Sequence, residues 1–208
     1  MAKTSDAVTV AVTGASGIQY GLRLLECLLA SDREVHLMVS DAARVVGKLE
    51  MDLALPTRPR DMERFVRDRF PGLRGTLLAF GNNEWTAPAA SGSGAPRSMV
   101  VCPCTTGTLS AIAMGTSNSL IERAADVVLK ERGTLILVPR ETPFSEIHLD
   151  NMLKLARMGA LMLPANPGFY HRPRTVADMV DFVVARVLDH LSVPQSLIPP
   201  WGMEGAPP

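Results

Sequence analysis

The stretch V-T-V-A-V-T-G-A-S-G-I-Q-Y-G, residues 8–21, places a short apolar run directly before a glycine-rich turn. A β-branched run of this length that stops at Gly14 is typical of a strand buried on both faces of a sheet. Beyond the turn, apolar side chains recur at helical spacing, at Ile18, Leu22, Leu25 and Leu29. This stripe predicts an amphipathic helix that ends near Ser31.

The same alternation of strand and helix continues along the chain. Further strands are predicted at 35–39, 76–80, 98–102, 134–138 and 160–163, with helical patterns between them. Ser40 is placed to cap a helix that runs toward Glu50, and a last amphipathic helix from Val176 ends before Pro194. We therefore expect an α/β fold: one Rossmann-like domain over 1–208, a three-layer sandwich with a mostly parallel sheet and a tail from about residue 194.

Composition excludes several classes of protein. Lys plus Arg and Asp plus Glu number 21 each, so no overall field attracts nucleic acid or anionic lipid. Neither a signal-peptide core nor an apolar run of membrane-spanning length is present in the sequence. Three cysteines form no disulfide framework and indicate a reducing compartment, so we expect a cytoplasmic protein.

The C-P-C segment at 102–104 raises the question of a metal. Cys102 and Cys104 lack a second cysteine pair or a close set of histidines that would complete a tetrahedral site. Free cysteines also behave as small buried hydrophobic residues. We prefer that interpretation and predict no metal.

Gly14, Ala15 and Ser16 lie in the turn between the first strand and the first helix. Unpaired N–H groups and the helix dipole favour an anion there, such as a phosphate monoester. The turn lacks the full dinucleotide glycine pattern and the lysine of a P-loop, so neither NAD nor ATP is well supported. A plain tight connection remains the alternative.

A second polar turn follows the strand at 98–102 and consists of Thr105, Thr106, Gly107 and Thr108. In open parallel sheets the ligand lies beyond the carboxyl ends of the strands. Both turns and Ser40 would then face one crevice. The alternative is three ordinary helix caps.

Arg140 and Glu141 follow the strand at 134–138 and should point into the same crevice. Arginine offers a planar donor fork for phosphate, and the glutamate beside it is a candidate for proton transfer. The alternative is a solvated ion pair between them.

Three further groups can be read in two ways each. Arg186 lies at the edge of the apolar stripe of the last helix, so it would pair either with Asp189 or with a ligand phosphate, and the residues alone favour Asp189 slightly. Lys130 is either a favourable charge at a helix C-terminus or a ligand group. The segment 86–96 is either disordered or a loop that covers a ligand.

Six ordered blocks link these features to one family. They are T-G-A-S-G-I-Q-Y-G at 13–21, A-A-S-G-S at 89–93, V-V-C-P-C-T-T-G-T-L-S at 100–110, E-R-A-A-D-V-V-L-K-E-R at 122–132, V-P-R-E-T-P-F at 138–144 and P-G-F-Y-H-R-P at 167–173. Together they resemble the flavin prenyltransferase family of the UbiX type, once described as hydroxyarylic acid decarboxylases. The resemblance covers nearly the whole chain.

The resemblance implies two sets of site residues. Those expected around FMN are Gly14, Ala15, Ser16, Ser40, Thr105, Thr106, Gly107, Thr108, Arg123 and Arg140. Those expected around a prenyl phosphate are Ser16, Glu50, Ala90, Ser91, Lys130, Arg140, Tyr170 and Arg186. Glu141 would transfer protons, and Glu50, Ser16 and Lys130 would join it in catalysis.

The resemblance also implies an activity and partners. Such an enzyme joins the dimethylallyl group of dimethylallyl (pyro)phosphate to N5 and C6 of reduced FMN without a metal. The prenylated FMN would pass to a UbiD-type decarboxylase. Family members form homo-oligomers, commonly dodecamers, with sites shared between subunits, so Glu50 or Trp201 would act across an interface.

Two other functions stay open. An FMN-dependent cysteine-type decarboxylase of the same fold would be expected to carry a histidine near the first helix, and residues 18–31 contain none. A non-catalytic FMN carrier would have no use for the clustered cationic side chains. For the preferred function we expect the two turns and these cations to converge at a single edge of the sheet.

Overall fold

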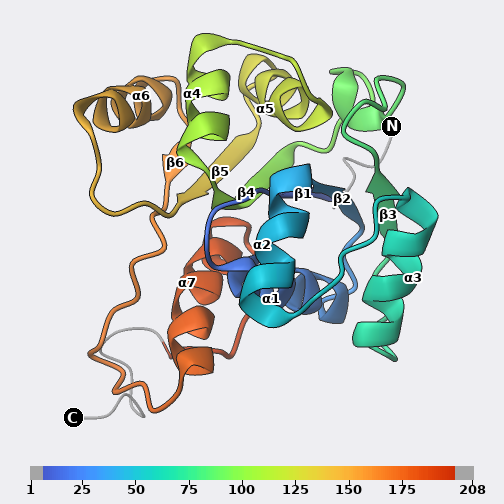
Figure 1. The fold of residues 1–208 in the computed structure, drawn as a ribbon, viewed down its shortest axis with the longest axis vertical. Coiled ribbons are helices and arrows are strands. Elements are labelled where there is room, and N and C mark those ends of the chain that lie inside the picture. Colours follow the sequence, from blue (N-terminus) through green and yellow to red (C-terminus); the bar gives the residue numbers. More distant parts are fainter. Residues whose placement is uncertain (1–6, 200–208) are drawn as a thin grey trace.

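The computed structural model describes residues 7–199, and within that range six strands form one sheet in the order β3-β2-β1-β4-β5-β6 (Figure 1). The strands are β1 Val8–Val12, β2 Val35–Val39, β3 Leu77–Phe80, β4 Ser98–Cys104, β5 Thr134–Pro139 and β6 Leu161–Met162. All of their pairings are parallel. The predicted parallel α/β sheet is therefore confirmed.

Helices cover both faces of the sheet, which gives the predicted three layers (Figure 1). They are α1 Ile18–Ala30, α2 Asp41–Met51, α3 Pro59–Arg69, α4 Thr106–Met114, α5 Leu120–Lys130, α6 Glu146–Arg157 and α7 Val176–His190, with a 3₁₀ turn at Pro88–Ala90. The buried faces of α1, α3 and α7 share one hydrophobic core. The buried faces of α4, α5 and α6 share the other.

Side-chain alternation along the strands explains the two cores. Val10 and Ile136 face the α1 and α7 layer, whereas the neighbouring residues Ala11 and Leu137 face the α4 and α5 layer. All four are fully buried. A strand buried on both faces has no polar side to show, so its sequence is a continuous apolar run.

β4 extends through the C-P-C segment, two residues beyond the predicted end. Cys104 pairs with Pro139 of β5, and the register shifts between Val101 and Cys104. Because of this irregularity Cys102 lies in one core and Cys104 in the other. Burial raises the pKa of both thiols. Within residues 7–199, no three or more His, Cys, Asp or Glu side chains are grouped so that they could hold a metal ion.

The strand order reverses between β1 and β4, since the chain moves outward to β2 and β3 and then returns to β4. The loops after β1 and β4 therefore leave in opposite directions, and a crevice opens between them. Such a switch point is where ligands bind in sheets of this kind. None of the described helices is long and apolar enough to cross a bilayer, and Trp201 lies outside the described residues.

Candidate active site

The turn after β1 ends at Gly17, which takes a left-handed conformation with φ 104°. A Cβ at this position would lie 2.8 Å from the Tyr20 ring, so glycine is required for both reasons. No side chain of the turn caps α1; instead the Gly17 N–H donates to Glu50 Oε2 at 2.9 Å. A carboxylate therefore already binds where the sequence predicts an anion.

The position of Glu50 beside the start of α1 determines its charge state. Burial opposes its ionisation, but hydrogen bonds from Ser16, Gly17 and Ile18 and the charge of Arg140 lower its pKa below the ordinary value of 4.5. The donors all belong to the turn and first residues of α1. Glu50 thus contacts the crevice of its own chain, at the end of α2.

The turn after β4 begins α4. Thr105 is the N-cap, and its hydroxyl oxygen accepts the Thr108 N–H at 3.0 Å. The N–H groups of Thr106 and Gly107 stand in the first turn of α4, where the helix offers them no acceptor. Ser40 caps α2 by accepting the Ala43 N–H at 3.1 Å, so the capping roles of Ser40 and Thr105 are confirmed.

Thr13 joins the two turns. Its buried hydroxyl donates to the Pro103 carbonyl at 2.8 Å and accepts the Thr105 N–H at 2.9 Å. The Thr13 N–H also donates to Pro103 O at 3.2 Å. The turns after β1 and β4 are therefore parts of one structure at one crevice.

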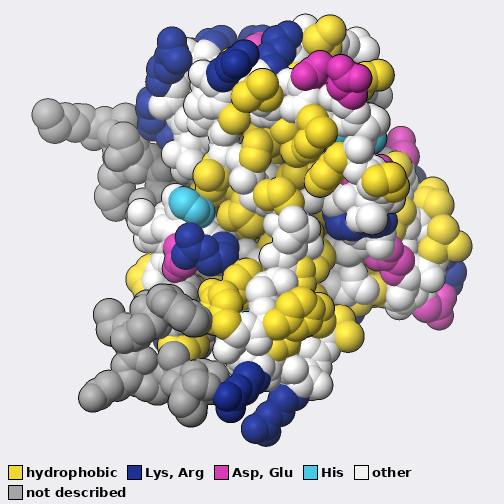
Figure 2. Space-filling view, turned by 90° about the vertical axis from the view of Figure 1, so that its left-hand side faces the viewer, with side chains coloured by type: hydrophobic (Ala, Val, Ile, Leu, Met, Phe, Trp, Pro, Cys, Tyr) yellow, Lys and Arg dark blue, Asp and Glu magenta, His cyan; other side chains and the backbone are white. Residues whose placement is uncertain are grey.

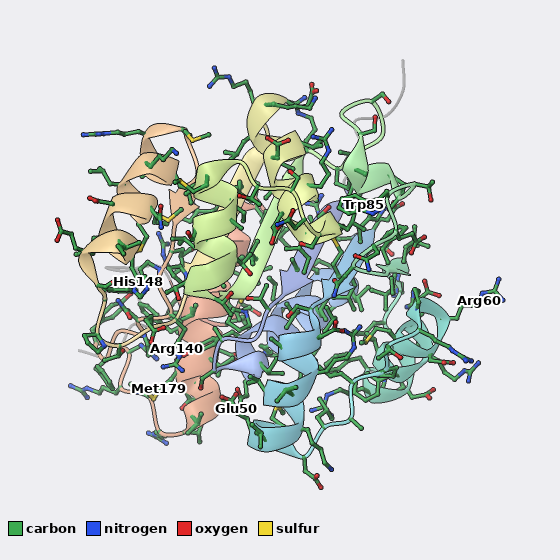
Figure 3. All side chains as sticks on the ribbon, turned by 45° about the horizontal axis from the view of Figure 1, so that its top comes forward. Glu50, Arg60, Trp85, Arg140, His148 and Met179 are labelled. Atoms are coloured by element: carbon green, nitrogen blue, oxygen red, sulfur yellow. The ribbon has the colours of Figure 1, made fainter. Side chains whose placement is uncertain are left out.

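Arg140 follows β5 at the same edge of the sheet, on the side of Glu50 (Figure 3). Its Nε is buried and has no hydrogen-bond partner in residues 7–199. Its charge helps to lower the pKa of Glu50, and it opposes the rise in the pKa of Tyr20 that burial causes. A buried, unsatisfied Nε on a half-buried arginine, beside free helix N–H groups, fits an anionic ligand such as the phosphate of FMN.

Glu141 points to its own backbone rather than to Arg140. One carboxylate oxygen accepts the Thr142 N–H at 3.0 Å, and the described residues contain no ion pair between Arg140 and Glu141. The predicted alternative, a solvated ion pair between these neighbours, is therefore wrong. Arg140 remains available to a ligand.

A second group of predicted site residues lies along α5. Arg123 donates from Nε to the Ala90 carbonyl at 3.1 Å and pairs with Asp126 at 2.8 Å. Lys130 pairs with Glu131 beside Gly92. The segment 86–96 thus packs on α5, with Ala87 and Ala89 buried; we call Ala90, Ser91, Arg123 and Lys130 the α5 group.

Lys130, the last residue of the α5 group along the chain, is at the opposite edge of the sheet from the crevice. Lys130 ends α5 just before β5 begins, whereas Arg140 follows the last residue of β5. β5 holds six residues, and at ~3.3 Å per residue its ends lie ~20 Å apart. A lysine side chain does not span this distance.

A third group surrounds a cavity of about 460 Å³ beside α7, which Tyr170, Phe182, Arg186 and Gln195 help to line. The Tyr170 ring contacts Phe182 edge-on, with centroids 5.5 Å apart. Arg186 donates from Nη1 to Asp189 Oδ2 at 2.8 Å. The carboxylate partner favoured for Arg186 is thus confirmed, and Tyr170 and Arg186 do lie at one cavity.

The expectation that the two turns and the cations converge at a single edge of the sheet is wrong for Lys130, which lies at the other end of β5 from Arg140. The crevice holds Gly14, Ala15, Ser16, Ser40, Glu50, the turn 105–108 and Arg140. The α5 group and the Tyr170–Arg186 cavity lie elsewhere. The roles assigned to the individual residues stay predictions.

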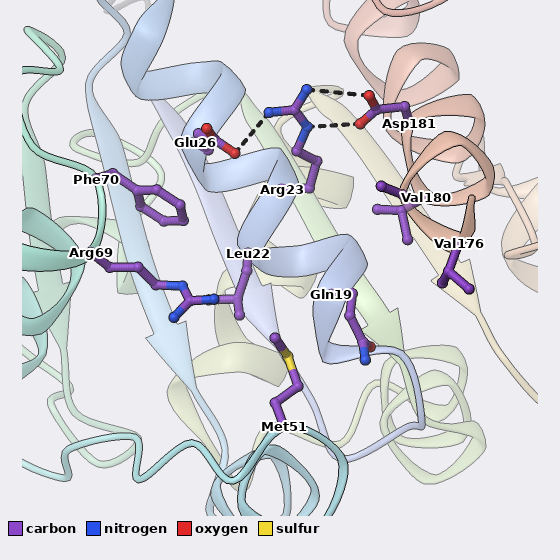
Figure 4. A pocket seen from close by; sticks show the side chains of 11 residues that line it. Gln19, Leu22, Arg23, Glu26, Met51, Arg69, Phe70, Val176, Val180 and Asp181 are labelled. Carbon is purple, nitrogen blue, oxygen red and sulfur yellow. Dashed lines mark hydrogen bonds and ion pairs between the residues drawn. The ribbon is translucent and has the colours of Figure 1, made fainter. Parts of the chain in front are cut away.

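A groove of about 400 Å³ between α1 and α7 is separate from all three groups (Figure 4). Arg23 closes one end by pairing with Asp181 at 2.7 Å and with Glu26 at 2.8 Å. These charges satisfy one another. None of the predicted site residues lines this groove.

Sequence reasoning gave no role to Thr13 or Tyr20. Thr13 ends an apolar strand, and a buried hydroxyl there needs hydrogen-bond partners. This feature of the sequence could have identified Thr13. Tyr20 gave no signal, because its proximity to Arg140 depends on how α1 packs across β4.

The fold and crevice define a class: an α/β protein with a site for an anionic group at the switch point of a parallel sheet. The family model described as Flavoprotein matches residues 2–188. "Flavin prenyltransferase UbiX" of Pseudomonas aeruginosa is 58% identical over 197 residues, covering 95% of this chain and 94% of the relative. The same protein of Alkalihalophilus pseudofirmus is 47% identical, with 94% and 96% covered. The chain belongs to the UbiX flavin prenyltransferase family of flavoproteins.

Solved structures agree with this membership. AnUbiX in complex with FMN and dimethylallyl pyrophosphate superposes with a TM-score of 0.83 at 38% identity, covering 96% of this chain and 98% of that one. A dodecameric FMN-dependent UbiX-like decarboxylase from Escherichia coli O157:H7 gives 0.79 at 40%, covering 90% and 95%. The FMN-dependent cysteine decarboxylase TvaF, at 16% identity, shares the fold only.

Proposed function

We propose that this protein is a flavin prenyltransferase that joins the dimethylallyl group of dimethylallyl (pyro)phosphate to N5 and C6 of reduced FMN. The observation that carries the proposal is the pair of turns joined through Thr13, with the unsatisfied Arg140 Nε beside them. The names of relatives up to 58% identical support the reaction. AnUbiX, solved with FMN and dimethylallyl pyrophosphate, supports both ligands.

FMN would be held in the crevice. Gly14, Ala15 and Ser16 offer the start of α1, and the turn 105–108 offers the N–H groups at the start of α4. Ser40 borders the same edge, and Arg140 supplies the charge-assisted donors for an anionic group. Reduced FMN supplies the nucleophilic N5 and C6 atoms to which the prenyl group is joined.

Departure of phosphate is the step the side chains must assist. Clustered cations stabilise the charge that develops on a leaving phosphate, which is the usual role of magnesium. Lys130, Arg140 and Arg186 are the cations we assign to this role, with the Tyr170 hydroxyl as a further donor and no metal. Glu141 holds or moves protons, and Glu50 with Ser16 forms the part of this site nearest α1.

Completion of this site requires further copies of the chain. Lys130 lies ~20 Å from Arg140 in its own chain, so we assign the α5 group to the crevice of a neighbour, and the Tyr170–Arg186 cavity likewise. Arg123, expected beside FMN, belongs to the α5 group and would reach a neighbour's flavin. Ala90 and Ser91 would border the prenyl chain there.

The surface supports assembly. Hydrophobic side chains gather across the middle of the face that carries α6 and the segment after β6 (Figure 2). On α6, Ile147, Leu149 and Leu153 are 69%, 53% and 49% exposed, which is costly for a helix that stays uncovered. We propose a homo-oligomer, a dodecamer like the UbiX-like decarboxylase of Escherichia coli.

The product would serve a UbiD-type decarboxylase. We further propose a cytoplasmic location, supported by the free Cys27, Cys102 and Cys104. Cys102 and Cys104 are fully buried in separate cores, so they do not pair with each other.

Mass spectrometry of the flavin tests the proposal. Anaerobic incubation with reduced FMN and dimethylallyl phosphate should give a flavin heavier by one prenyl unit. An unchanged flavin mass with FMN bound would instead support a carrier. Oxidative decarboxylation of a cysteine peptide under the same conditions would support the cysteine-type decarboxylase.

A further inference from the structure

One side chain, Gln195, holds the segment that follows α7. Its Oε1 accepts the N–H groups of Leu197 at 2.8 Å and Ile198 at 3.2 Å. Its Nε2 donates to the Ile198 carbonyl and to Asp189 Oδ1, both at 3.2 Å. Every bonding direction of this amide is used, so Gln195 closes the 195–198 turn and fastens it to α7.

Asp189 in turn holds Arg186. Its Oδ2 accepts from Arg186 Nη1 at 2.8 Å, while Oδ1 accepts from Gln195. Each carboxylate oxygen therefore has a donor from a different residue. No other described residue bonds the guanidinium of Arg186, so its Nε and Nη2 are left for a ligand.

All three side chains line the cavity of about 460 Å³ that contains Tyr170, and Ile198 forms another part of its wall. The turn that Gln195 closes is thus part of the cavity. Arg186 lies ten residues after Val176, ~15 Å along α7. The orientation of the Arg186 side chain depends on these local contacts, since this part of α7 is far from the crevice.

We infer that Gln195, acting through Asp189, is a positioning residue for Arg186 in the prenyl-phosphate site. The inference rests on the proposed function, in which Arg186 binds phosphate. With Oδ1 occupied by Gln195, Asp189 takes one bond from Arg186 and leaves the rest of the fork free. Without that donor, Asp189 turns both oxygens to Arg186, and a bidentate pair withdraws the guanidinium from the cavity.

The Gln195→Glu variant separates the two roles of the side chain. A carboxylate keeps an acceptor for the N–H groups of Leu197 and Ile198 but offers Asp189 a like charge in place of a donor. The Ser196→Glu variant is the matched control, because it adds the same charge one residue along, at an exposed position outside the chain of bonds from Gln195 to Arg186.

We expect Gln195→Glu to raise the KM for dimethylallyl phosphate about tenfold. We also expect kcat to fall, because Arg186 stabilises the leaving phosphate, and the Kd for FMN to stay within about twofold. Ser196→Glu should match the wild type in all three. An unchanged KM in Gln195→Glu, or an equal rise in the control, would overturn the positioning role.

A charge-neutral exchange gives a second test. When Gln195→Glu is combined with Asp189→Asn, the amide introduced on α7 donates to the new carboxylate and its oxygen accepts from Arg186, so the chain of bonds is restored in reverse. The KM should return to within about threefold of wild type. No recovery would overturn the inference, as would a parallel weakening of FMN binding, which indicates a general structural effect. Absence of prenylated flavin with the wild-type protein would instead overturn the proposed function and the inference with it.

Discussion

The Thr13 hydroxyl makes one buried and one part-buried hydrogen bond, and both reach the end of another strand, β4, and the turn that follows it. Thr13 sits at the end of β1, and its partners, Pro103 and Thr105, lie at the end of β4. A crevice between two strands keeps its width only if something fixes their loops relative to each other. At the residue scale, this one side chain does so.

Thr13→Val, which preserves shape, should leave the Thr105 N–H unpaired and Pro103 O with the Thr13 N–H as its one remaining donor. We expect the free energy of unfolding to fall by ~1–3 kcal/mol and the affinity for FMN to weaken, whereas Thr13→Ser keeps both. Urea denaturation and titration with FMN measure the two effects. FMN affinity equal to wild type in Thr13→Val would contradict the coupling of the turns.

The lowered pKa of Glu50 predicts that the stability of the protein depends on pH. Its pKa is lowered in the folded protein, so its ionised form adds stability above the ordinary pKa, and this contribution is lost as the pH falls through the folded-state value. The difference in unfolding free energy between wild type and Glu50→Gln should therefore be present near neutral pH and shrink in acid. A difference that stays constant from neutral pH to acid would show that the charge is not involved.

Strands were the elements best predicted from sequence. Val35–Val39 matches its prediction at both ends, and β1, β3, β4, β5 and β6 differ by one or two residues, because buried parallel strands are continuous apolar runs. The irregularity that sends Cys102 and Cys104 to opposite cores had no signal, since it depends on pairing with β5.

The structure of the segment 86–96 could not be predicted from the pattern of its side chains. Small residues give no periodicity, so disorder and a ligand loop could not be told apart. The structure packs it on α5, with Ala89 only 1% exposed. Small side chains are needed here because the loop lies directly on a helix.

Ala89→Leu should overfill this contact. We expect the free energy of unfolding to fall by ~1–3 kcal/mol and prenyl transfer to slow, while FMN binds as in wild type, because the segment packs on α5. Thr86→Leu, at an exposed position of the same segment, is the control. Loss of FMN affinity in Ala89→Leu would place the segment beside the chain's own crevice.

At the scale of the whole molecule, the sequence could name site residues but not say which copy of the chain supplies them. A family resemblance assigns roles along one sequence, whereas an assembled site draws on several. Lys130 and Arg140 flank the same strand, so their separation follows from the strand's length alone. This separation is what makes a site shared between copies testable.

Mixed oligomers test that claim most directly. Lys130→Ala and Arg140→Ala subunits, each nearly inactive alone, are co-expressed with different tags, purified together and assayed for prenylated FMN. Random mixing places an intact crevice against an intact α5 group in about a quarter of the sites, so we predict that up to about a quarter of wild-type activity returns. Mixed oligomers no more active than their parents would contradict an active site built from more than one copy.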